Sequence, residues 1–63
     1  MNKENIVKVK KFNYQSKLDS YQVTVKENES EILYTVPIAD ANVDYQTVFQ
    51  WEIDGNTIEE ADA

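Results

Sequence analysis

Apolar and polar residues alternate with a period of two along the first part of the chain. In residues 6–14, Val7 and Val9 share one parity, and Lys8 and Lys10 share the other. This pattern is typical of a β-strand with one buried and one solvated face. It predicts a first strand over residues 6–14.

The alternation slips in the middle of this segment. After the pair Lys10-Lys11, Phe12 and Tyr14 take the parity of the lysines. A β-bulge at Lys10-Lys11 would return both aromatic side chains to the apolar face. We therefore expect such a bulge, followed by a polar connection over residues 15–20.

Two further segments show the same period. Tyr21, Val23 and Val25 alternate with polar residues, which predicts the clearest half-buried strand of the chain. The turn at 27–30 contains no glycine, so a loop of four or five residues is expected rather than a tight primed turn. A third strand then begins near residue 32 and ends at Pro37, which lacks a backbone N–H.

The period changes to that of a helix after Pro37. Asn42 is placed to cap a helix over residues 42–54, with Asp44 in the first turn, where a negative charge suits the helix dipole. Gly55 follows where a left-handed residue commonly ends a helix. The only glycine of the chain therefore marks its end.

The predicted buried stripe of this helix consists of Tyr45, Val48 and Phe49, at the spacing i, i+3, i+4. Trp51 points away from the stripe and Glu52 falls near its centre. Such a helix does not give a simple helix-on-sheet core.

The predicted fold is α+β, in which a three-stranded antiparallel β-meander (1–36) is followed by one short C-terminal α-helix (42–54) and an acidic tail (57–63). Thr57 and Glu60 have the spacing of a capping box, but too few residues follow for a stable helix. Residues 1–63 form one small domain.

Charge is divided unevenly along the sequence. Residues 1–26 carry all six lysines against two carboxylates, a balance of +4, and residues 27–63 carry ten carboxylates and no Lys or Arg, a balance of −10. If the two halves lie on different sides, the molecule has a strong dipole that orients it toward charged partners. The split favours an interaction role.

Size and residue types argue against an enzyme and against a cofactor or metal site. A chain of 63 residues has no Cys and no His, which removes the common nucleophiles, bases and metal ligands. Asp40, Asn42 and Asp44 resemble the start of a calcium loop. However, Tyr45 stands where that loop needs glycine, and Trp51 stands where it needs glutamate. We expect no small-molecule substrate.

The same sequence makes membrane and nucleic-acid partners improbable. Its uninterrupted apolar runs are only two or three residues long, and its acidic total opposes phosphate binding. Lys8, Lys10 and Lys11, near two aromatic residues, would be the contact if nucleic acid were bound. The simpler interpretation is a solvated lysine face on an edge strand.

Candidate partner-binding residues are aromatic as well as basic. Trp51 is either an interface anchor or a core residue, and the sequence favours neither. Tyr45 and Phe49 join it on the helix as candidates, together with Lys8 and the two lysines that follow it in the first strand.

Residues 36–62 resemble a segment of short proteins from tailed bacteriophages. The similarity lies in Val36-Pro37 followed by Asp40-Ala41-Asn42-Val43-Asp44-Tyr45-Gln46, in Trp51, and in the stop Gly55-Asn56-Thr57. Glu52 departs from it, because that position is commonly apolar in such segments. Residues 1–35 are not covered.

The resemblance implies a non-enzymatic accessory protein of the virion, made in the host bacterial cytoplasm. It would bind tail, baseplate or capsid proteins, or copies of itself, in several copies. The alternative is a small acidic inhibitor whose carboxylates imitate a nucleic-acid backbone and block a host nucleic-acid-binding protein.

Overall fold

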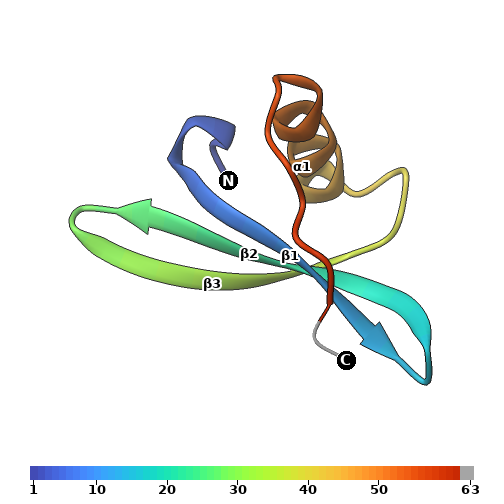
Figure 1. Cartoon of the computed structure of the whole chain (residues 1–63). Helices are drawn as coiled ribbons and strands as arrows, with labels where there is room; N and C mark the ends of the chain where they lie inside the picture. The colour runs from blue at the N-terminus through green and yellow to red at the C-terminus, as the bar shows by residue number, and fades with distance from the viewer. Residues whose placement is uncertain (62–63) are drawn as a thin grey trace.

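The chain forms a long, twisted antiparallel sheet with one helix against its inner face (Figure 1). The computed structural model describes residues 1–61. A 3-10 turn, η1 (Lys3–Asn5), leads into strands β1 (Ile6–Tyr14), β2 (Lys17–Glu27) and β3 (Ser30–Pro37), and helix α1 (Val43–Ile53) follows. The strand order is β1-β2-β3. The predicted α+β fold with a meander and one later helix is confirmed.

A bulge near the start of β1 decides which side chains face the core. The register of β1 against β2 shifts between Ile6 and Lys8, which leaves Val7 as an extra residue. Ile6 and Val9 consequently turn to the same face and are buried, whereas Val7 is 53% exposed. The prediction that Val7 and Val9 share the buried face is therefore wrong.

The bulge expected at Lys10-Lys11 is not formed, because both residues keep a continuous register with β2. A second irregularity lies later, between Phe12 and Asn13. Phe12 and Tyr14 are accordingly exposed rather than returned to the core.

Both hairpins turn through two residues, without glycine. Gln15 and Ser16 have φ of 52° and 65°, and Asn28 and Glu29 have φ of 49° and 69°. Two successive positive φ values define the primed turn that matches strand twist. The longer connections expected over 15–20 and 27–30 are therefore wrong. Regular pairing up to the turn holds these residues in a conformation that costs a non-glycine residue roughly 1–2 kcal/mol.

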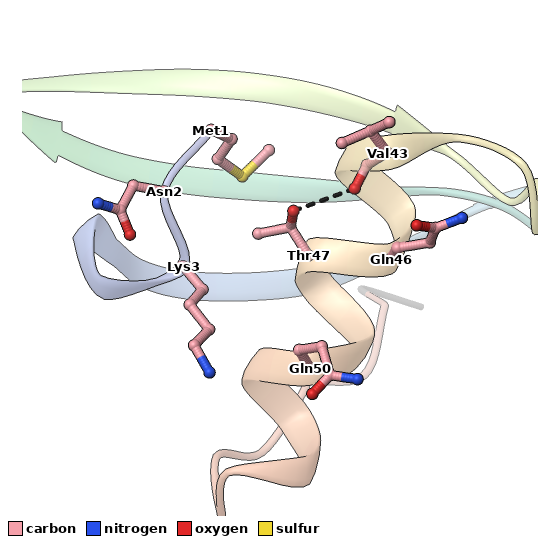
Figure 2. A pocket seen from close by; sticks show the side chains of 7 residues that line it. All are labelled: Met1, Asn2, Lys3, Val43, Gln46, Thr47 and Gln50. Carbon is pink, nitrogen blue, oxygen red and sulfur yellow. Dashed lines mark hydrogen bonds between the residues drawn. The ribbon is translucent and has the colours of Figure 1, made fainter.

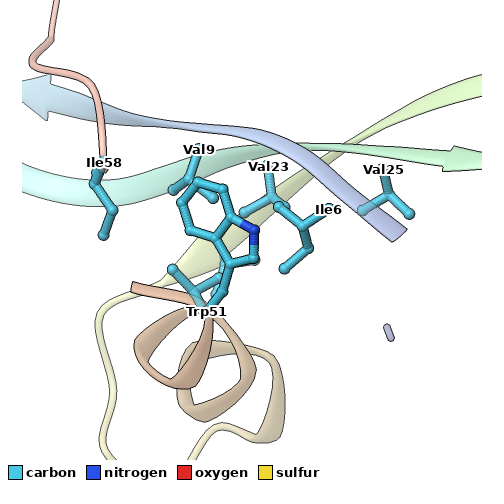
Figure 3. Packing of buried hydrophobic residues seen from close by; sticks show 8 residues of the cluster. Ile6, Val9, Val23, Val25, Trp51 and Ile58 are labelled. Atoms are coloured by element: carbon cyan, nitrogen blue, oxygen red, sulfur yellow. The ribbon is translucent and has the colours of Figure 1, made fainter. Parts of the chain in front are cut away.

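The core lies between the inner face of the sheet and α1 (Figure 3). In this view the indole of Trp51 points from the helix toward the side chains of the sheet. The buried hydrophobic residues of the described chain are Ile6, Val9, Val23, Val25, Val36, Val48, Trp51 and Ile58.

The helix has the predicted capping signals. The Asn42 side chain accepts a hydrogen bond from the Tyr45 N–H at 3.0 Å, and Gly55 follows the helix with φ of 110°. The helix Val43–Ile53 thus agrees with the expected span of 42–54.

The buried side of α1 differs from the predicted stripe. Val48 and Trp51 are buried, and Phe49 is 51% exposed. Trp51 has the largest apolar side chain of the helix, and the helix is rotated so that the indole rather than the phenyl ring is buried. Glu52 is consequently exposed. The predicted position of Phe49 is wrong.

The segment after the helix belongs to the fold and is not a free tail. Ile58 is buried, and Glu59 forms a parallel bridge with Lys10. The Lys11 N–H donates to the Glu59 carbonyl, and the Glu59 N–H donates to the Val9 carbonyl, both at 2.9 Å. The predicted tail is therefore wrong for residues 57–61, and Asp62 and Ala63 lie outside the described residues.

Candidate functional site

The two oppositely charged parts of the sequence meet in the folded chain. Within residues 1–61, each ion pair joins a cation of the first eleven residues to a carboxylate of residues 44–60. The pairs are Met1 amino group–Asp44 (3.8 Å), Lys3–Asp54 (2.7 Å), Lys8–Glu59 (3.8 Å) and Lys11–Glu60 (3.0 Å). Ion pairs at a protein surface stabilise little individually. These contacts bring the basic N-terminal part and the acidic segment together, so the condition for the expected dipole, that the two halves lie on different sides, is not met at these contacts.

The Lys11 contact also changes how that lysine titrates. The Glu60 carboxylate accepts a hydrogen bond from the ammonium group and attracts its charge, and together these raise the pKa of Lys11 above 10.5. Nearby, burial raises the pKa of Tyr21 above 10.0. The ring of Tyr21 stacks on that of Tyr45, with centroids 6.1 Å apart and planes 5° apart. Both pKa shifts favour the protonated form.

Trp51 is not available as an exposed anchor. Only 9% of this residue is accessible to solvent, and it belongs to the core cluster. Of the two roles considered from the sequence, its burial fits the core role.

The three candidate lysines do not form one basic patch. Lys8 and Lys10 pair with polar residues of β2 on the outer face, whereas Lys11 lies opposite Tyr21 on the inner face. Glu59 lies 3.8 Å from Lys8 and pairs with Lys10 along the strand. A single-strand nucleic-acid site needs uncompensated cations along one groove, and this arrangement does not supply them.

The side of α1 turned away from the sheet carries three large, exposed apolar residues. Val43, Phe49 and Ile53 are 72%, 51% and 60% exposed. At 100° per residue, they fall on the half of the helix opposite Val48 and Trp51. We call these three residues the α1 outer face. Among these three, the sequence analysis names only Phe49 as a candidate partner-binding residue. It also places Phe49 in the predicted buried stripe, which the structure does not support.

A shallow depression adjoins this face. It has a volume of about 430 Å³ and is lined by Asp40, Tyr45, Gln46, Phe49 and Gln50. Two of the predicted partner-binding residues, Tyr45 and Phe49, are thus brought together.

A second depression, of about 490 Å³, lies between η1 and the helix (Figure 2). Its ionisable groups are the Met1 amino group and Lys3, which are paired with Asp44 and Asp54. Its remaining lining residues are Asn2, Val43, Gln46, Thr47 and Gln50. Thr47 donates to the Val43 carbonyl (3.0 Å).

Residues 1–61 contain neither a cluster of metal ligands nor a helix that could span a membrane. No group of three or more carboxylates in this part converges as a metal site would require. The Asn42 side chain, from the calcium-like motif, is engaged in capping α1. No helix in the same part is both long and apolar enough to cross a membrane.

Leu33 is the most exposed large apolar residue of the sheet, at 63%, and sequence reasoning missed it. The signal was present in the adjacent apolar residues Ile32-Leu33, since two neighbours in a strand must face opposite sides. Exposed apolar surface, rather than a reactive cluster, is therefore what the described residues present.

No protein-family model, curated protein or solved structure matches the chain.

Proposed function

We propose that the chain is a non-enzymatic accessory protein that binds other virion proteins of a tailed phage in several copies. The observation that carries a binding role is the α1 outer face. A helix already packed on one side has no folding reason to carry three large apolar residues on the other side, and exposed apolar side chains gathered on one side of a helix are typical of interaction sites. The resemblance of residues 36–62 to phage accessory proteins makes the virion the first assembly to test.

The partner surface we infer is apolar with a basic rim. The segment 40–54, which contains α1, carries four carboxylates and no Lys or Arg. Two of them, Asp44 and Asp54, already pair with the Met1 amino group and Lys3. Asp40 and Glu52 remain at the border of the exposed helix and would meet lysines or arginines of the partner. Such rim charges steer association more than they add affinity.

We prefer this role to imitation of a nucleic-acid backbone. A mimic needs carboxylates exposed at regular spacing, with their charge uncompensated. In the described chain Asp54, Glu59 and Glu60 each face a lysine within 4 Å. The acidic half therefore presents less free negative charge than its sequence indicates.

Mass spectrometry of purified virions tests the proposal. Virions of the phage that encodes the chain should contain it, in several copies, at a constant ratio to the tail or capsid proteins. The double variant Phe49→Ser/Ile53→Ser should remain folded by circular dichroism, because both side chains are exposed, and should be lost from the virions.

Leu18→Ser is the matched control, since Leu18 is exposed but lies in the β1–β2 hairpin, away from α1. It should be incorporated like the wild type. Virions that lack the wild-type chain would overturn the virion role, and incorporation of the double variant at the wild-type ratio would overturn the assignment to the α1 outer face.

A further inference from the structure

The two edges of the sheet are protected very differently. At the β1 edge, the backbone of Glu59 bonds Val9 and Lys11. Within residues 1–61 no segment pairs with the outer edge of β3, the last strand in the order β1-β2-β3. Proteins usually protect an open edge with lysine, a bulge or an internal proline. β3 contains no lysine, its register is unbroken from Ser30 to Pro37, and its only proline is its last residue.

The groups that β3 presents at this edge follow from the hairpin. The two-residue turn is flanked by the pair Glu27–Ser30, which is the hydrogen-bonded pair in a hairpin of this kind. Alternate residues of β3 therefore bond β2, and the residues between them direct N–H and C=O groups outward. The outward residues are Glu31, Leu33 and Thr35.

We propose that two copies of this chain pair through β3, antiparallel and centred on Leu33, to form one continuous six-stranded sheet. In this register Leu33 lies opposite Leu33 of the second copy, and Glu31 lies opposite Thr35. All three outward residues of each copy then find backbone partners. The proposal extends the function proposed above, because it names the surface through which copies of the chain contact one another.

The side chains of β3 suit this register. Glu31 is the only charged residue of the strand, and the two Glu31 carboxylates would start from positions four residues apart along the paired strands. At about 3.4 Å per residue that is roughly 14 Å, beyond the Debye length of about 8 Å at physiological salt. An antiparallel register centred on Glu31 would instead place the two carboxylates directly opposite each other. Charge therefore favours the register centred on Leu33.

The same register covers apolar surface on both faces. The two Leu33 side chains, each 63% exposed, would meet on the outer face. On the inner face Ile32, 38% exposed, would lie opposite Tyr34 of the second copy, and the symmetric contact would form as well. Aromatic and β-branched residues are favourable neighbours across antiparallel strands. Each residue of one copy lies opposite a residue of the second copy that faces the same side of its own sheet. The inner faces of the two sheets are therefore continuous, and both helices lie on the same side of the joint sheet.

Cysteine cross-linking tests the register directly, since the chain has no cysteine of its own. Directly opposed residues of a hydrogen-bonded pair have Cα atoms about 5.5 Å apart, within the range that a disulfide spans. Under mild oxidation Leu33→Cys should form a covalent dimer. Leu18→Cys is the matched control, because Leu18 is also an exposed leucine of the sheet, at 42%, but lies in the β1–β2 hairpin, away from the β3 edge. We expect Leu33→Cys to cross-link at least about tenfold faster than this control, through the higher effective concentration. Equal rates would overturn the proposal.

A charge at the symmetry axis gives an independent measurement. Sedimentation equilibrium of the wild type over a dilution series should approach twice the chain mass of 7.3 kDa. Leu33→Lys should remain at the monomer mass, because two like charges would meet. Thr24→Lys adds the same charge to the central strand, opposite Leu33 on the same face, and should still dimerise. A wild type that stays monomeric throughout, or a Leu33→Lys variant that dimerises normally, would overturn the proposal.

These readouts separate the two proposals. A dimer that is never found in virions would refute the virion role and leave the β3 pairing standing. A monomer that enters virions would refute the pairing alone.

Discussion

The buried position of Ile58 can be tested by a matched pair of substitutions. Ile58 is 8% exposed and belongs to the core cluster, whereas Ile53, on α1, is 60% exposed. Ile58→Ala and Ile53→Ala remove the same atoms. A buried Ile→Ala change costs about 2–5 kcal/mol, depending on how far the site can collapse. Ile58 contributes from a segment without regular secondary structure, which relaxes readily, so we expect about 2–3 kcal/mol. Ile53→Ala should lie within about 0.5 kcal/mol of the wild type.

Urea unfolding followed by tryptophan fluorescence measures both values, since the only Trp of the chain lies in the core. A single core in a chain of this size supplies roughly 3–5 kcal/mol, so Ile58→Ala should remove about half or more of the total. With a urea slope of about 1 kcal/mol/M for a small protein, the midpoint should fall by about 2–3 M. In a thermal scan the melting temperature should fall by roughly 8–24 °C.

Equal midpoints for the two variants would refute the reasoning. They would mean that residues after Gly55 contribute nothing to the core and that the segment is the free tail that the sequence predicts. A large loss for Ile53→Ala would instead show that the exposed side of α1 is covered in solution.

Two further predictions concern the two hairpin turns and the folding stability at alkaline pH. Glu29→Gly and Ser16→Gly should each stabilise the chain by up to about 1 kcal/mol in urea unfolding, since glycine adopts the positive φ of these positions without steric cost; a loss of stability in either would contradict the turn geometry. The pKa values of Lys11 and Tyr21 are higher in the folded chain than in the unfolded chain. The contribution of these two groups to folding stability is therefore fully present below about pH 10 and is lost as the pH rises through their folded-state pKa values. The urea concentration at the midpoint should therefore fall as the pH is raised above about 10, and Glu60→Gln should make this fall smaller. An increase of the urea midpoint over the same pH range would contradict the raised pKa values of Lys11 and Tyr21.

The sequence was sufficient for the order of the elements and for the helix ends. Both depend on local chemistry: the period of two in the strands, an Asn side chain that bonds the first turn, and a glycine with positive φ. Such signals act over a few residues, so they can be read without knowing the fold.

Features set by contacts between distant segments could not be predicted in this way. The bulge at Val7 exists because Ile6 and Val9 both meet the core, and nothing within β1 distinguishes that position from Lys10-Lys11. Phe49 and Trp51 are both candidates for the buried side of α1, and the shape of the sheet decides between them. The candidate interaction surface was missed for the same reason, because an exposed apolar residue becomes informative only when the core is known.

The place of Ile58 in the core has a consequence for biosynthesis. The inner face of the meander is complete once β3 has been made, but its last buried contact comes from a residue twenty-one positions beyond the end of that strand. While those residues are still inside the ribosome, the valines of the sheet and the open β1 edge face solvent. The core of this domain is therefore incomplete until residue 58 has left the exit tunnel, and during that delay the nascent hairpins expose apolar surface of the kind that favours aggregation.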